Sequence, residues 1–367
     1  MKIPYVDLKL QWAEERDELL PIIDRILSEA SHVGGNEIKL FEENIKKIVK
    51  TNYAVALNSG TDALTLSLHL LGVKAGDEVI TPPNSFIAST SVVVHLGAKP
   101  IFVDVKSDQL IDSKKIEASI TENTKAIMPV HLTGRMCDMD EIMNISEKYN
   151  IPVIEDAAQS IGSSYRGKPA GSIGHIGCFS GHPLKNLNAF GDAGYLTTND
   201  KTISDKVRSL ANHGIVERNI VNNFGYVSRM DSIQAGILNY HITKLDAVIK
   251  QRRENAKYYK ELLNSDHVYF PESDENNYDS YHTFVIQVDK RSELISFLDS
   301  KGIQTSIHYP IPIHLQPAAK YLGHKIGSFP QTEIQAERIL TLPINQFMDR
   351  EKIQYVSSSI NFFYENF

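Results

Sequence analysis

Short apolar runs alternate with segments that have the spacing of amphipathic helices between about residue 53 and residue 200. Helical patterns of this kind are found at residues 62–72 and 138–149. We interpret six of the apolar runs as strands, at residues 53–57, 78–81, 100–105, 126–130, 152–156 and 176–180. The alternation predicts βαβ units, and therefore an α/β fold in which a mostly parallel central sheet is covered by helices on both faces.

The pattern changes near residue 236. From there to residue 263, apolar residues recur every three or four positions, which predicts one long amphipathic helix. Later segments predict further elements: a strand at 281–288, a helix at 291–302, a strand at 304–310 and a terminal helix. We therefore expect a large α/β domain at residues 1–245 and a smaller α+β domain at residues 246–367.

Composition limits the possible partners and the compartment. The 367 residues carry a net charge of −7 and no long basic run, which argues against nucleic acid or an anionic membrane surface as the main partner. Cys137 and Cys178 are too few for a disulfide framework. The first 20 residues lack the apolar core of a signal peptide, and polar residues interrupt the longest apolar runs. We expect a cytoplasmic protein.

Three segments at predicted strand ends carry candidate chemistry. In the first, LNSGTDALTLSL, the small residues Ser59, Gly60 and Thr61 separate a strand from a helix. Backbone N–H groups at such a helix start can bind an anion such as a phosphate. The simpler interpretation is an ordinary helix cap.

The second segment, IPVIEDAAQSIG, places Asp156 where a buried strand should end, and Gln159 three residues later. One helical turn would direct both side chains the same way. Asp156 could cap a helix, or it could hold a protonated heterocyclic nitrogen.

The third segment, CFSGHPLKNLNAFGDAGYLTT, contains a single lysine, Lys185, five residues after Ser180. Partial burial and neighbouring cations lower the pKa of a lysine and make its amine a nucleophile towards carbonyl groups. Ser180 ends a predicted strand and is well placed to bind a phosphate oxygen.

An anion-binding turn, an acid for a ring nitrogen and a nucleophilic lysine together match the requirements of pyridoxal 5′-phosphate (PLP). Phe86, at another strand end, could stack on the pyridine ring, although an isolated phenylalanine is more often part of the core. The Cys, His and Asp spacings suggest no metal site.

The motifs SGTDAL, EDAAQSIG, FSGHPLKNLNAFGDAG and HYPIPIHLQPA resemble those of the DegT-type sugar aminotransferases, which are fold-type I PLP enzymes. The resemblance covers nearly the whole chain and implies a dimer in which each active site is completed by the neighbouring subunit. It implies that Lys185 binds the cofactor as an imine and moves protons, and that Asp156 keeps the pyridine nitrogen protonated. It further implies phosphate contacts from Gly60, Thr61 and Ser180, a contact of Gln159 with the ring hydroxyl, and stacking by Phe86.

Two positions depart from the family pattern. Val227 stands where the family usually has an asparagine that reaches the phosphate in the partner subunit, and Asn222 or Asn223 could replace it. Gly181 stands where the family commonly has an aromatic residue. Both departures bear on cofactor affinity and substrate fit rather than on the enzyme class.

Substrate contacts are less sharply defined. Arg229 and Lys168 are candidates for binding the donor carboxylate or the sugar diphosphate, with solvated surface charge as the alternative for Lys168. The loop that contains His308, Tyr309 and His314 is one that the family places near the sugar. We interpret His182 and His213 as structural.

The resemblance implies transfer of an amino group from L-glutamate to a nucleotide-linked keto-6-deoxysugar, with release of 2-oxoglutarate. The stretch Gly191–Gly194 favours amination at C3 over C4. Related sugar dehydratases have histidine in place of the lysine, so Lys185 argues against that activity. A regulatory protein that binds PLP without turnover remains an alternative.

Overall fold

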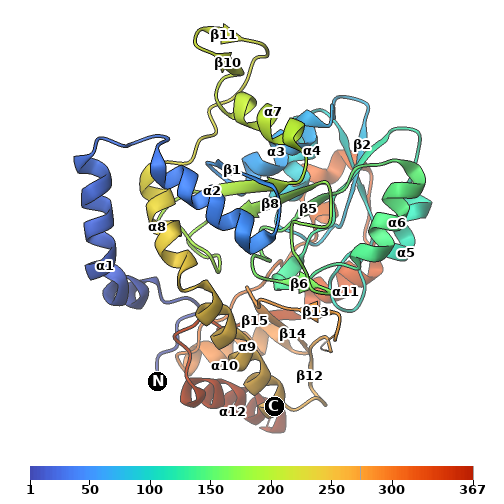
Figure 1. Ribbon diagram of the computed structural model, residues 1–367. Helices are drawn as coiled ribbons and strands as arrows, with labels where there is room; N and C mark the ends of the chain where they lie inside the picture. The colour runs from blue at the N-terminus through green and yellow to red at the C-terminus, as the bar shows by residue number, and fades with distance from the viewer. Residues whose placement is uncertain (273, 367) are drawn as a thin grey trace.

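The central sheet of the computed structural model, which describes residues 1–272 and 274–366, lies between two layers of helices (Figure 1). Its strands are β1 (Tyr53–Leu57), β2 (Glu78–Thr81), β3 (Lys99–Phe102), β4 (Thr124–Ile127), β5 (Ile154–Asp156), β8 (Ile176–Ser180) and β9 (Gly194–Thr198). All six predicted strands are present. The short hairpins are β6 (Ser164–Tyr165) with β7 (Lys168–Pro169) and β10 (Ile215–Glu217) with β11 (Ile220–Val221).

The expected α/β fold is confirmed, and its sheet pairing is mixed. Strand β2 pairs in parallel with β3 and β4, and β5 pairs in parallel with β8. Strand β9 runs antiparallel to both β1 and β8. Parallel bridges from Ile127 to Val153 and from Val130 to Asp156 connect the two groups of strands. The carboxyl ends of β1, β5 and β8 therefore lie at one edge of the sheet, together with the start of β9.

Helices cover both faces because side chains alternate along each strand. Ala54 and Ala56 of β1 face one apolar core, and Val55 and Leu57 face the other. The first core is covered by α2 (Asn36–Val49), α6 (Met139–Tyr149) and α8 (Ser232–Ile242). The second is covered by α3 (Gly60–Leu70), α4 (Ala88–His95) and α7 (Lys201–Ala211). Helix α1 (Leu8–Ser28) lies outside these layers, whereas α5 (Ser113–Ile116) lies beside α6 and contributes Ile116 to the first core (Figure 1).

The C-terminal elements surround a third apolar core, which also takes in Ile3. They are α9 (Leu245–Leu262), β12 (Val268–Tyr269), β13 (Asn277–Tyr278), β14 (Phe284–Val288), α10 (Arg291–Ser300), α11 (Pro330–Arg338), β15 (Ile339–Leu342) and α12 (Arg350–Asn366). The strand predicted at 281–288, the helix at 291–302 and the terminal helix are thus confirmed. The proposed domain boundary at residue 245 stays a prediction.

The prediction of one helix across residues 236–263 is wrong, because α8 ends at Ile242 and α9 begins at Leu245. The Thr243 hydroxyl donates to the Tyr240 carbonyl (2.7 Å), and the Lys244 N–H bonds three residues back, to His241. Side-chain competition of this kind favours termination of a helix. Helix α8 is buried on nearly all sides. Its apolar residues therefore do not mark a single buried face that continues into α9.

The predicted strand at 304–310 is also wrong. Ser306 forms two backbone hydrogen bonds with Thr341 of β15 (3.1 and 2.7 Å), and the Gln304 N–H donates to the Ile3 carbonyl (2.9 Å), but these isolated contacts form no continuous ladder. Pro310 and Pro312 follow closely, and proline cannot donate a hydrogen bond to a strand ladder. The segment instead forms a loop.

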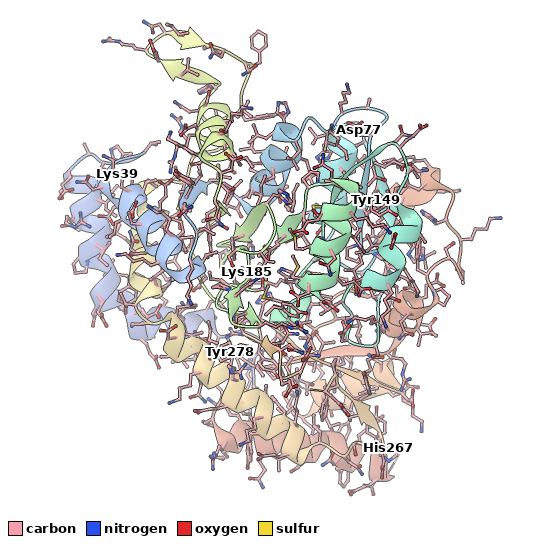
Figure 2. All side chains as sticks on the ribbon, turned by 45° about the vertical axis from the view of Figure 1, so that its right-hand side comes forward. Lys39, Asp77, Tyr149, Lys185, His267 and Tyr278 are labelled. Carbon is pink, nitrogen blue, oxygen red and sulfur yellow. The ribbon has the colours of Figure 1, made fainter. Side chains whose placement is uncertain are left out.

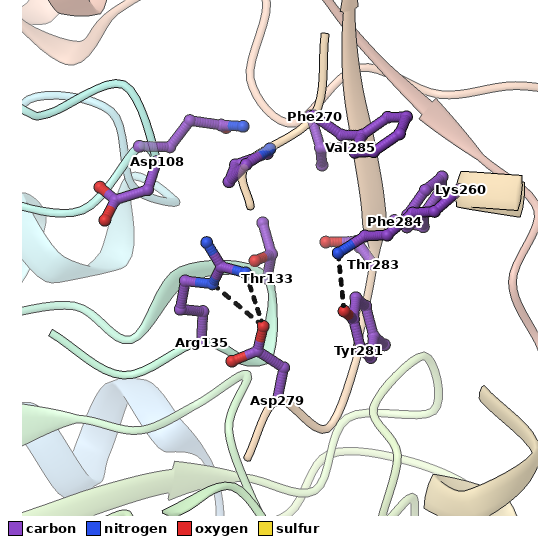
Figure 3. Close-up of a pocket in the computed structure, with 12 residues that line it drawn as sticks. Asp108, Thr133, Arg135, Lys260, Phe270, Asp279, Tyr281, Thr283, Phe284 and Val285 are labelled. Carbon is purple, nitrogen blue, oxygen red and sulfur yellow. Dashed lines mark hydrogen bonds and ion pairs between the residues drawn. The ribbon is translucent and has the colours of Figure 1, made fainter. Parts of the chain in front are cut away.

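A buried ion pair joins the loop after β4 to the segment before β14 (Figure 3). Arg135 donates to Oδ2 of Asp279 from Nη2 (2.8 Å) and Nε (3.0 Å), and both side chains are less than a tenth exposed. On the other side of the same small cavity, the Lys260 amine donates to the Tyr281 hydroxyl (3.3 Å). The Arg135–Asp279 pair therefore holds the C-terminal elements against the central sheet.

We predict that Asp279→Ala lowers the free energy of unfolding by about 3–5 kcal/mol, because it leaves the Arg135 guanidinium buried without its counter-ion. Chemical denaturation measures the loss. The control is Asp205→Ala, which removes an exposed pair with Lys201 and should cost less than about 1 kcal/mol. Equal losses in the two variants would contradict the structural role given to Asp279.

Candidate active site

A cavity of about 470 Å³ opens at the edge of the sheet where the carboxyl ends of β1, β5 and β8 meet. This edge is where open α/β sheets bind ligands. The cavity brings together all seven residues that the sequence predicted for the cofactor: Gly60, Thr61, Phe86, Asp156, Gln159, Ser180 and Lys185.

The start of α3 forms one wall of the cavity. Ser59 caps this helix, with its hydroxyl accepting from the Asp62 N–H (3.1 Å), so the interpretation as a helix cap is correct for Ser59. The cap does not exclude anion binding, because the first N–H groups of a helix have no partner within it. A side chain at Gly60 would place its Cβ 2.9 Å from the Ser180 Cβ. The glycine thus lets the helix start approach the end of β8.

Gly194 makes a second close approach from the start of β9. A Cβ there would lie 2.1 Å from the Ser59 carbonyl carbon, a distance that no side chain can adopt. Three backbone segments therefore converge on one point: the start of α3, the end of β8 and the start of β9. They leave room for a compact anion beside Thr61 and the Ser180 hydroxyl.

Asp156 ends β5 and is 5% exposed. Its Oδ2 accepts from the Ser89 hydroxyl (2.7 Å), and its Oδ1 accepts from the Ala158 N–H (3.2 Å). Burial raises the pKa of this carboxyl, while the two hydrogen bonds and the charge of Lys185 act in the opposite direction. Among the described residues, no helix follows Asp156 directly, so its interpretation as a helix cap is wrong. The Ala158 contact closes a local turn, and the carboxyl lines the cavity.

Lys185 lies inside the molecule, between the central sheet and the C-terminal elements (Figure 2). Burial lowers the pKa of its amine to about 8, and the charge of Asp156 partly opposes this shift. A larger fraction of this amine than of an ordinary lysine is therefore neutral, and nucleophilic, near neutral pH.

Neighbouring asparagines fix the loop that carries Lys185. Asn186 donates to the Ser280 carbonyl (2.9 Å), and Asn188 donates to the Pro183 carbonyl (3.2 Å). Gly181 also contributes, since a Cβ there would lie 3.0 Å from the Ala193 Cβ. An aromatic side chain at position 181 would have to displace Ala193, which explains the departure from the family pattern.

Gln159 and Phe86 both contact Tyr309, a loop residue that also lines the cavity. Gln159 accepts from the Thr133 N–H (2.8 Å) and donates to the Tyr309 hydroxyl (3.3 Å). The rings of Phe86 and Tyr309 are 5.8 Å apart, and Phe86 is 55% exposed at the mouth. His308 also lines the cavity and accepts or donates at Thr341 Oγ1 (3.0 Å). Burial lowers the pKa of His308 to about 4.

Other predicted contacts lie outside this cavity. Arg229 donates to Asn212 Oδ1 (3.2 Å), Lys168 is exposed in β7, and Val227 is 56% exposed. His314 instead bonds to Glu333 (3.0 Å), and its ring packs on Phe329. Within one chain, His314 does not line this cavity, and its contact with the substrate stays a prediction.

Sequence reasoning missed several residues that line the cavity, namely Tyr5, Ser89, Arg252 and His282, and it treated His182 as structural although His182 lines the cavity too. Arg252 lies on the buried face of α9, in register with the apolar residues Ile249 and Ala256, so a charged residue at an apolar position was a signal that could have identified it. His282 lies just before a strand and did not stand out. Ser89 carried no signal in the sequence beyond its place in a helix that follows a strand.

The residues present fit PLP. The cavity offers a backbone anion site, a buried carboxyl, an amine of lowered pKa and a partly exposed aromatic ring. No group of three or more His, Cys, Asp or Glu residues in the described chain could hold a metal ion. Within the same residues, no helix is both long and apolar enough to cross a membrane.

Comparison with known proteins agrees with this chemistry. The sequence model of the DegT/DnrJ/EryC1/StrS aminotransferase family matches residues 13–361. A "Pleiotropic regulatory protein" of Geobacillus stearothermophilus is 38% identical, over the whole of both chains. A UDP-N-acetyl-3-dehydro-alpha-D-glucosamine 3-aminotransferase of Acidithiobacillus ferrooxidans is 40% identical over 98% of this chain and 97% of its own. A dTDP-3-amino-3,6-dideoxy-alpha-D-galactopyranose transaminase of Aneurinibacillus thermoaerophilus is 38% identical, with 98% and 99% coverage.

Solved structures give the same result. S. venezuelae DesV, in complex with a ketimine intermediate, superposes with a TM-score of 0.97 and 35% identity over 100% of this chain and 99% of that one. NtdA of Bacillus subtilis, with bound pyridoxamine phosphate, has a TM-score of 0.89 and 32% identity over 96% and 82% of the two chains.

We predict that acetylation of Lys185 in the cofactor-free protein rises with pH about a midpoint near 8, because burial depresses the pKa of this amine. Competitive labelling with peptide mass spectrometry measures the midpoint. The exposed Lys201 is the control, since its hydrogen bond to Asp205 raises the pKa of its amine.

Asp156→Asn should lower the Lys185 midpoint further, because the substitution removes the negative charge that favours the protonated amine. A Lys185 midpoint equal to that of Lys201, or one that rises in Asp156→Asn, would contradict the electrostatics described for this cavity.

Proposed function

The chain belongs to the DegT/DnrJ/EryC1/StrS aminotransferase family of PLP-dependent sugar aminotransferases, and we propose that it moves the amino group of L-glutamate to C3 of a nucleotide-linked keto-6-deoxysugar. The observation that carries the proposal is the joint placement of Lys185 and Asp156 in one cavity beside the glycine-lined start of α3. The product would serve the synthesis of a surface polysaccharide, such as an O-antigen, or of another glycoconjugate, in the cytoplasm.

The proposed roles follow from the positions of the side chains. When bound, the cofactor draws electrons from the carbon that carries the transferred amine. Gly60, Thr61 and Ser180 would hold the phosphate, and Asp156 would keep a proton on the ring nitrogen. Lys185, as a free amine, would take a proton from the donor α-carbon and deliver it to the cofactor carbon that is bonded to the transferred nitrogen.

The remaining two residues fix the plane of the ring. Phe86 covers one of its faces, and Gln159 bonds to the ring hydroxyl while Thr133 and Tyr309 hold the amide in place. The ring would thereby be held with its reactive carbon towards Lys185.

Amination at C3 is supported by the stretch Gly191–Gly194 and by two relatives whose names specify 3-amino sugars. Amination at C4 is the alternative. His308 and Tyr309, which line the cavity, are the proposed sugar contacts.

A second candidate is a regulatory protein that binds PLP without turnover. It is favoured by the 38% identity to a protein named as a pleiotropic regulator. Conversion of the bound cofactor to its amine form by L-glutamate would distinguish an enzyme from such a regulator.

We also propose a homodimer with shared active sites. The hairpin of β10 and β11 projects away from the rest of the molecule (Figure 1), and it exposes Val216, Ile220 and Val221. Phe224, just beyond it, is 98% exposed. Apolar exposure of this extent is typical of an interaction surface. In the dimer, Arg229 and Val227 would face the neighbouring subunit's cavity.

We predict that the holoenzyme with L-glutamate converts a nucleotide-linked 3-keto-6-deoxysugar to the 3-amino product. A panel of 3-keto and 4-keto sugars linked to dTDP, UDP or GDP identifies the substrate by product mass, and NMR locates the nitrogen. Nitrogen at C4 would refute the proposed position and leave the enzyme class intact. Absence of product from every member of the panel would refute the proposed function.

We predict that Val227→Asn slows dissociation of pyridoxamine phosphate about tenfold or more. A new hydrogen bond to the charged phosphate of the neighbouring site is worth about 1.5–3 kcal/mol, and each 1.4 kcal/mol is a factor of ten. Exchange with fresh cofactor measures the rate.

The control is Val221→Asn, an equally exposed position on the projecting hairpin, which should leave the dissociation rate unchanged. An unchanged rate in Val227→Asn would show that Asn222, Asn223 or a water already fills the role, or that position 227 does not reach the phosphate.

A further inference from the structure

Arg252 is a buried cation that lines the cavity without a carboxylate partner among the described residues. It lies on α9 and is 6% exposed. Its Nη1 donates to the backbone carbonyls of Tyr281 (3.2 Å) and His282 (3.1 Å), and its Nη2 lies 3.5 Å from Gln346 Oε1. Its Nε is buried with no hydrogen-bond partner. A buried charge in this state is costly unless an anion completes its surroundings.

His282, which follows Tyr281 on the same wall, has a matching deficiency. Its Nδ1 is buried and forms no hydrogen bond. Burial lowers the pKa of its imidazole well below the usual value, and the charges of Lys185 and Arg252 lower it further. Both residues line the cavity, and each has one nitrogen that is enclosed by protein and forms no hydrogen bond to a described residue. His282 lies close enough to Lys185 for the lysine charge to lower the pKa of its imidazole. On Arg252, Nη2 has only the 3.5 Å contact with Gln346 within the described chain.

The cations that line the cavity are Lys185 and Arg252, and the carboxylates are Asp156 and Asp192. Burial lowers the pKa values of His182, His282 and His308, so these rings add no positive charge near neutral pH. The charge of Asp156 acts on Lys185, and no carboxylate of the described chain acts in this way on Arg252. The cofactor phosphate is accounted for by the start of α3 and the end of β8, which belong to different elements from Arg252. The wall formed by α9 and the segment before β14 thus provides a site for a second anion.

The position of this site restricts what the second anion can be. An anion bound beside the reacting amine must belong to a group close to the reacting carbon. In an α-amino acid, the carboxylate is attached directly to the carbon that carries the amine. In a nucleotide-linked sugar, the diphosphate is attached at C1 and is separated from C3 by two ring bonds and an oxygen. A planar guanidinium also matches the geometry of a carboxylate.

We propose that Arg252, together with His282, binds a carboxylate of the amino donor and so selects an acidic α-amino acid as the donor. The inference rests on the proposed transamination, for which it supplies a donor site. Arg252 is a substrate-binding residue in this scheme, and it positions the α-carbon for proton transfer by Lys185.

Glutarate is the probe for this site, because it carries the two carboxylates of the donor and no amine that could react. We expect the wild-type holoenzyme to bind glutarate in a calorimetric titration. Arg252→Gln should raise the Kd about tenfold or more, since a charge-assisted hydrogen bond is lost. Arg252→Lys should bind with an intermediate Kd, because an ammonium keeps the charge and loses the planar fork.

The matched control is Arg253→Gln. The neighbouring Arg253 stacks on Tyr278, 3.7 Å from the ring centre, and does not line the cavity. The Arg253→Gln substitution should leave the Kd for glutarate unchanged. In the steady state, Arg252→Gln should raise the KM for L-glutamate and leave the KM for the nucleotide sugar unaltered.

Three results would overturn the inference: no binding of glutarate to the wild-type holoenzyme, a wild-type Kd in Arg252→Gln, or an equal loss in Arg253→Gln. If Arg252→Gln does not fold, as judged by its Tm, a wild-type Kd for glutarate in Arg252→Lys would likewise overturn the inference. Loss of glutarate binding in Arg252→Gln, combined with no amino transfer to any sugar by the wild-type enzyme, would support the carboxylate site and refute the proposed function.

Discussion

The burial of the Lys185 amine beside the Asp156 carboxyl is the constraint on which the rest of the site depends. Burial lowers the pKa of the lysine and raises that of the aspartic acid, while their mutual attraction opposes both shifts. Burial thus weakens the charged form of each group, and a bound partner can stabilise either one. A cofactor that supplies a carbonyl carbon and a basic ring nitrogen satisfies both groups at once.

The fold maintains this pair through backbone contacts rather than through side-chain volume. Gly60 and Gly194 allow three backbone segments to meet where an added Cβ would clash, and Gly181 allows the lysine loop to rest on Ala193. The hydrogen bond from Asn186 to the Ser280 carbonyl attaches this loop to the C-terminal elements. The position of the amine is therefore set by the contact between the sheet and those elements.

Much of this arrangement could be predicted from the sequence, because alternating apolar runs and small-residue turns have local causes. The six strands between residues 53 and 180, the capped start of α3 and the residues at those strand ends were predicted on that basis, whereas β9 was not predicted. The break between α8 and α9 was not, because it depends on one threonine hydroxyl bond and on burial around the whole of α8. Arg252 and His282 were missed because only the folded chain shows that both residues line one cavity and that Arg252 has no carboxylate partner among the described residues. His314 was assigned to the substrate from its loop; in the folded chain it bonds to Glu333, and its substrate contact stays a prediction.

The most direct test of the central claim is reduction of the holoenzyme with borohydride, followed by digestion and peptide mass spectrometry. If Lys185 is the buried nucleophile of the cavity, reduction fixes the mass of the cofactor on the peptide that contains Lys185. Lys185→Ala should bind the cofactor and release it after the same treatment, because no covalent bond forms to the protein. A stable label on any other lysine, or a labelled Lys185→Ala protein, would contradict the account.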